Sequence, residues 1–162
     1  MIFRLAIIGV VLALGSPASA ACSGKFASMA KLAGGEPSVL MRNPAVKSAM
    51  KQVLGTAQKQ LKKSLEVHGW VDLIDCQLVV EGNARHGGGV RNAVLSFSLY
   101  DGSLSVGLMD HGRVTVFSSH SSEKSFIYDY LPAYVRDWAY VAANGFRSRG
   151  SPPANVLFYR SK

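Results

Sequence analysis

Residues 91–118, RNAVLSFSLYDGSLSVGLMDHGRVTVFS, decide the fold class of this chain. Apolar side chains recur at every second position in three runs: Ala93, Leu95, Phe97 and Leu99, then Leu104, Val106 and Leu108, then Val114 and Val116. A period of two is typical of a β-strand with one buried face. Asp101-Gly102 and Asp110-His111-Gly112 separate the runs, and Asp-Gly pairs favour tight hairpin turns. The stretch therefore predicts three consecutive antiparallel strands.

Before residue 91, the sequence contains another segment in which apolar residues recur at every second position, and ahead of it a segment in which they recur at helical spacing. A further half-buried strand is predicted by Ile74, Cys76, Leu78 and Val80. Before Gly69, apolar side chains recur on one helical face at Val46, Met50, Val53, Leu54, Ala57, Leu61 and Leu65. Asn43-Pro44 is typical of a helix start and Gly69 of a helix stop. The other faces of this predicted helix carry Lys47, Lys51, Lys59, Lys62 and Lys63, which favours a solvated surface.

Downstream, a second helix and a last strand are predicted. The helix begins at Pro132, ends near Asn144-Gly145 and turns inward Leu131, Val135, Trp138, Ala139 and Ala142. Residues 155–160, NVLFYR, suit an edge strand. The order of elements predicts an α+β fold, in which an antiparallel β-meander sheet of four to five strands packs with two main helices.

The N-terminus predicts export. Arg4 is followed by the apolar run LAIIGVVLAL and by SPASA, which ends in small residues. This is the layout of a secretory signal peptide over residues 1–20, cleaved near Ala20. Residues 21–162 then form a single domain that is periplasmic or secreted and does not span a membrane. Lipid attachment at Cys22 is the alternative to simple cleavage.

In an exported chain with two cysteines, Cys22 and Cys76, a structural disulfide is the favoured interpretation. The formal net charge of +8 favours anionic partners such as lipid headgroups or lipopolysaccharide, or it serves solubility. Export argues against a nucleic-acid partner.

Catalytic and metal-binding patterns are missing from the sequence. The four histidines show neither the i, i+4 pairing nor the Cys/His spacing that metals need, and His68 is expected to cap the first helix. The sequence contains no G-x-S-x-G nucleophile motif. We therefore expect no metal, no cofactor and no enzymatic activity.

Between two predicted strands lies the loop NARHGGGVR, residues 83–91. Three consecutive glycines exceed what one tight turn requires, which favours a projecting loop. Together with DGSLSVGLMDHGRVTVFS, this segment resembles the inhibitor of vertebrate lysozyme (Ivy) family. The resemblance implies an exported inhibitor whose sheet carries a loop of pattern Cys-x-Pro-His-x-Cys-Gly into the active cleft of a lysozyme. The family histidine falls on His86, the final glycine on Gly89, and a following arginine approximately on Arg91.

The chain departs from that pattern, because Asn83 and Gly88 replace the loop cysteines and Arg85 replaces the proline. We nevertheless expect a partner-binding loop formed by Arg85, His86, Gly87, Gly88 and Gly89. Its expected partner is a lysozyme-like glycoside hydrolase or a lytic transglycosylase. Three alternatives remain: a loop that only connects two strands, a basic cell-envelope protein that binds anionic lipid or lipopolysaccharide, and an unrecognised peptidoglycan-active enzyme.

Overall fold

The computed structural model describes residues 22–87, 89–119 and 131–143 in full, and the backbone of 144 and 156–160. The predicted signal peptide with its cleavage site at Ala20, the loop residue Gly88, and His120 lie outside these described residues.

Short helices make up the first part of the described chain: η1 (Ala27–Leu32), α1 (Pro37–Arg42), α2 (Pro44–Leu54), η2 (Gly55–Ala57) and α3 (Gln58–Ser64). The predicted cap is confirmed, because the Ala45 backbone N–H donates to Asn43 Oδ1 over 3.0 Å. The prediction of one continuous helix up to Gly69 is wrong. Gly55, with φ of 52°, breaks it after α2, and α3 ends at Ser64.

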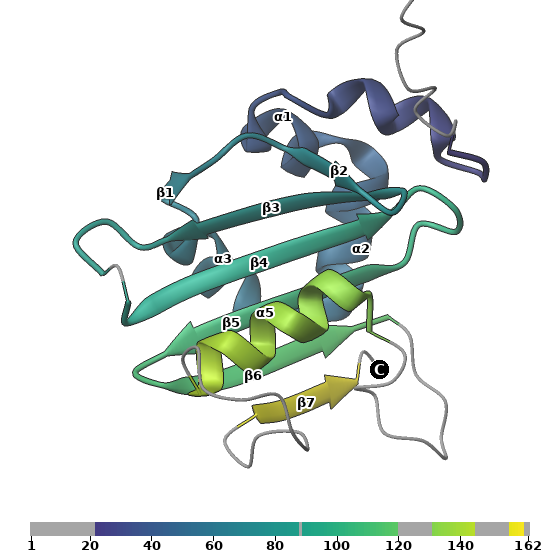
Figure 1. Cartoon of the computed structure of the whole chain (residues 1–162). Coiled ribbons are helices and arrows are strands. Elements are labelled where there is room, and N and C mark those ends of the chain that lie inside the picture. Colours follow the sequence, from purple (N-terminus) through teal and green to yellow (C-terminus); the bar gives the residue numbers. More distant parts are fainter. Residues whose placement is uncertain (1–21, 88, 120–130, 145–155, 161–162) are drawn as a thin grey trace, which may run out of the picture.

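In the described part of the chain, one sheet contains the strands β1 (Val67–His68), β2 (Asp72–Ile74), β3 (Gln77–Asn83), β4 (Arg91–Ser98), β5 (Leu104–Asp110), β6 (Arg113–Ser118) and β7 (Val156–Arg160). Its order is β1-β3-β4-β5-β6-β7, and β2 also pairs with β3 (Figure 1). The predicted meander is confirmed as β3 to β6, in which neighbouring strands are antiparallel. The predicted last strand is β7, which pairs in parallel with β6.

Three details of the prediction are corrected. The strand expected through Ile74, Cys76 and Val80 is a hairpin, because Asp75 and Cys76 have positive φ and Ile74 pairs with Gln77. Because α3 already ends at Ser64, His68 lies in β1 and does not cap a helix. The connection after β4 spans residues 99–103, longer than the predicted two-residue turn, and the Ser98 N–H donates to Ser103 O across it over 2.9 Å.

The sheet is covered on both faces. In Figure 1, α2 and α3 lie behind it and α5 (Ala133–Asn144) lies in front. Val80, Leu95 and Val106 pack toward the first group of helices, whereas Val79 and Val94 pack with Val135 and Ala139 of α5. β4 and β5 are therefore buried on both sides rather than half-buried as predicted.

The predicted disulfide between Cys22 and Cys76 is confirmed. It fastens the segment that precedes η1 to the turn between β2 and β3, with the two Cα atoms 5.5 Å apart. Next to it, the Phe26 ring meets the edge of the Phe97 ring at 5.4 Å between centroids. The N-terminal part of the described chain is thereby packed against the sheet.

Candidate functional site

The loop between β3 and β4 lies at one end of the sheet, at the same end as the turn between β5 and β6 (Figure 1). Ala84 at its base is buried, whereas Arg85 and His86 are exposed. Within the described part of the chain, neither of these two side chains has a hydrogen bond or an ion pair.

Backbone hydrogen bonds give the loop a defined turn. The Gly87 N–H donates to Ala84 O over 2.9 Å, and the Arg91 N–H donates to Gly87 O over 2.8 Å. His86 occupies the left-handed region with φ of 60°, and Gly89 does so with φ of 81°. A side chain at Gly87 would meet the Ala84 Cβ at 3.1 Å. Close packing against Ala84 thus explains why residue 87 is a glycine, and the positive φ explains why residue 89 is one.

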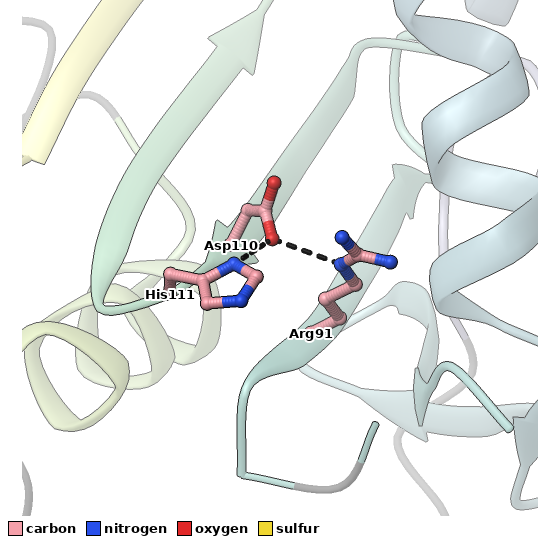
Figure 2. A network of polar contacts seen from close by, with 3 residues as sticks. All are labelled: Arg91, Asp110 and His111. Carbon is pink, nitrogen blue, oxygen red and sulfur yellow. Dashed lines mark hydrogen bonds and ion pairs between the residues drawn. The ribbon is translucent and has the colours of Figure 1, made fainter. Parts of the chain in front are cut away.

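Neighbouring elements tether the loop at both of its ends. Glu66 Oε2 accepts a hydrogen bond from the Arg85 backbone N–H over 3.2 Å. At the other end, the His111 backbone N–H donates to Val90 O over 2.9 Å. Figure 2 shows how the carboxylate of Asp110 holds Arg91 and His111 together, with Arg91 Nε at 3.0 Å and His111 Nδ1 at 2.7 Å from Asp110 Oδ1.

The Asp110 cluster is electrostatically favourable. The hydrogen bond from Arg91 is the main cause that lowers the pKa of Asp110 below its ordinary value, and the hydrogen bond from His111 lowers it further. Asp110 therefore stays ionised at neutral pH, and the hydrogen bond that it accepts from Arg91 Nε is charge-assisted. Through Asp110, the loop and the turn between β5 and β6 form one connected surface. Both ion pairs of Asp110 are exposed to solvent, so each of them is weak.

Beside this surface, a groove of about 600 Å³ opens between β1, β3 and α5. It is lined by His68, Trp70, Asp72, Glu81, Gly89 and Trp138, among others. Sequence reasoning missed this groove, because its walls come from distant parts of the chain. The isolated tryptophan in HGWVD, residues 68–72, was the only local signal, since it follows a glycine outside any apolar repeat.

Comparison with known protein families decides the relationship. The family model described as Inhibitor of vertebrate lysozyme (Ivy) matches residues 45–144, which is more than half of the chain. The chain belongs to the Ivy family. Membership implies lysozyme inhibition as the function of this Ivy-family chain. No curated protein and no solved structure matches the chain closely enough to add a relative or a structural neighbour.

The family match contains the whole meander, the loop of residues 83–91 and α5. Cys22 lies outside the matched range and Cys76 inside it. The disulfide of this Ivy-family chain thus joins the matched domain to a segment that the family model does not cover.

Apart from the loop and the groove, three further features of this Ivy-family chain were considered as sites: its lysines, metal binding and membrane-spanning helices. The lysines expected to face solvent do so: Lys47, Lys51, Lys59, Lys62 and Lys63 are all exposed. Among the described residues, no group of three or more His, Cys, Asp or Glu side chains is arranged to hold a metal ion. In the same residues, no helix is long and apolar enough to cross a bilayer.

Proposed function

We propose that this Ivy-family protein is a non-enzymatic inhibitor that occludes the active cleft of a lysozyme-like glycoside hydrolase or a lytic transglycosylase. The occluding segment is the loop from Arg85 to Gly89. The observation that carries the proposal is the exposed His86 side chain, which has no partner among the described residues and sits on a loop tethered from both sides.

The chemistry of such a cleft suits a histidine and an arginine. Glycoside hydrolases place two carboxyl groups on either side of the scissile bond, and at least one of them is ionised. The His86 imidazole donates a hydrogen bond to an ionised carboxylate, and the adjacent Arg85 guanidinium adds a second donor group. In a pocket from which water is excluded, such charge-assisted bonds are stronger than neutral ones.

Ordering of the loop before binding supports the same proposal. A loop that is flexible when free must lose conformational entropy on binding, which weakens affinity. Here the Glu66, Asp110 and His111 contacts restrain the loop without a disulfide of its own. This arrangement compensates for the replacement of the family cysteines by Asn83 and Gly88.

The proposal includes export to the periplasm or the medium. Its support is the signal-peptide pattern of residues 1–20 and the disulfide, since disulfides persist in oxidising compartments. Cleavage near Ala20 leaves Cys22 as the second residue of the mature chain, where it bonds to Cys76 rather than to a lipid.

A lysis assay tests the inhibitor function. The mature protein is titrated against an animal lysozyme and several bacterial lytic transglycosylases, with His86→Ala and Arg85→Ala in parallel. His86→Ala is expected to weaken inhibition by about 1.5–3 kcal/mol, the value of a hydrogen bond to a charged group. Arg85→Ala is expected to cost less if it contacts only the rim of the cleft. Inhibition of none of these enzymes, or equal inhibition by wild type and His86→Ala, would contradict the proposal.

The exposed lysines support a second candidate function, which is binding to anionic lipid or lipopolysaccharide. Cosedimentation with anionic vesicles at low and high salt tests it, because exposed charges are screened by salt. Replacing Lys59, Lys62 and Lys63 by Gln is expected to abolish vesicle binding in that case and to leave lysozyme inhibition unchanged. If the triple variant loses partner capture while His86→Ala keeps it, the envelope-binding function replaces the inhibitor function.

A further inference from the structure

Both tryptophans of the chain line the groove beside the loop. Trp70 follows β1 and is 61% exposed, which is unusual for so large an apolar side chain. Trp138 forms another part of the wall from α5, where its ring lies against Gly107 of the sheet. The groove therefore offers aromatic surface from two separate elements.

Two carboxylates lie in the same groove without a cation of their own. Asp72 pairs with Val79 in the register of β2 and β3, which places it diagonally across from Glu81 on the same face. Among the described residues, neither carboxylate forms an ion pair. Burial is the main cause that raises the pKa of Glu81; the hydrogen bond from the Tyr134 hydroxyl lowers this pKa, and the nearby Asp72 raises it further. The negative charge of this pair is uncompensated within the described chain.

One hydrogen-bond acceptor in the lining of the groove has no donor among the described residues. Asn92 also borders the groove, and its Oδ1 atom is buried without a hydrogen-bond partner among the described residues. A ligand that fits this lining must bring donors. Ammonium and guanidinium groups carry three and five donors and no acceptor, and aromatic faces attract cations within about 6 Å of the ring.

From this geometry we infer that the groove receives the guanidinium or ammonium group of a Lys or Arg side chain at the rim of the inhibited enzyme. The inference rests on the proposed function. Its second support is position, because Gly89 of the loop lines the groove as well. A partner whose cleft holds His86 brings its rim over Trp70, Asp72 and Glu81. On a chain of net charge +8, the groove supplies local attraction for a basic rim.

A probe titration tests the groove independently of inhibition. Tryptophan fluorescence is followed while Nα-acetyl-L-arginine amide is added, with Nα-acetyl-L-citrulline amide as the neutral control of nearly equal shape. Since both tryptophans line the groove, the signal reports on this place alone. We expect a saturable change with arginine amide, at least about tenfold weaker binding in Asp72→Asn/Glu81→Gln, and an unchanged response in His86→Ala. Circular dichroism checks that the double variant is folded.

Equal responses to arginine amide and citrulline amide would overturn the inference. So would a response to chitotriose that exceeds the response to arginine amide, since this would identify a saccharide site. An unaltered arginine response in the folded double variant would also overturn it.

The inhibition assay then tests the docking role. Asp72→Asn/Glu81→Gln is expected to weaken inhibition of the animal lysozyme about tenfold, with a smaller loss at high salt. If the double variant inhibits as well as the wild type, the inferred docking role is overturned. In that case a loss of inhibition in His86→Ala still supports the proposed function. If the wild type inhibits no enzyme, the proposed function fails, and the inferred docking role fails with it. The titration then decides only whether the groove binds a cation.

Discussion

Gly107 lies where Trp138 of α5 meets the sheet, and a Cβ atom there would overlap the Trp138 ring and come within 3.0 Å of Val94. Gly107→Ala is therefore expected to destabilise the fold by about 1–3 kcal/mol, as overpacked cores do. Alanine also reduces the conformational entropy of the unfolded chain, which offsets only about 0.4–1 kcal/mol of this destabilisation. Gly69→Ala is the matched control, because nothing lies within 4 Å of a Cβ there and its φ is not positive. Urea unfolding measures both, and equal stability of the two variants would contradict the prediction.

The loop and turn at the end of the sheet behave as one element through Asp110. Because the pKa of Asp110 is lower in the folded protein than its ordinary 3.8, its ion pair stabilises this end above that pH and is lost as the pH falls through the lowered pKa. Asp110→Asn is expected to cost under ~1 kcal/mol, as exposed pairs do. Faster amide exchange at Gly87, Arg91 and His111 at neutral pH is the measurement. Asp137→Asn, the same charge change on α5, should leave these amides unchanged, and unchanged exchange in Asp110→Asn would exclude the tether.

At the scale of the whole molecule, the Cys22–Cys76 bridge joins positions separated by 54 residues. Closing a long loop restricts the unfolded chain, so Cys22→Ser/Cys76→Ser is expected to lower the free energy of unfolding by about 2–4 kcal/mol. Wild type in reductant should fall to the same value, while the double variant should not respond to reductant. Denaturant unfolding with and without reductant measures these changes. Identical stability of oxidised and reduced wild type would mean that packing alone holds the N-terminal segment.

The meander, α5, the Asn43 cap and the disulfide could be predicted from the sequence, because their signals are visible in it directly: a period of two, a helical period, Asn before Pro, and an even number of cysteines in an exported chain. The strand, helix and cap signals act over a few residues and were not overridden by tertiary contacts at these positions. The exposed loop around His86 was also predictable, since its glycines exceed what a turn needs.

Features that depend on contacts between distant residues could not be predicted from the sequence. A hairpin at Asp75-Cys76 continues the apolar alternation of the flanking residues, so the sequence alone could not separate it from one strand. Burial of β4 and β5 on both faces required α5 to return over the sheet. The groove combines Trp70, Glu81 and Trp138, which no sequence spacing relates. Such sites arise from packing between elements, and packing is set by the whole chain rather than by its local patterns.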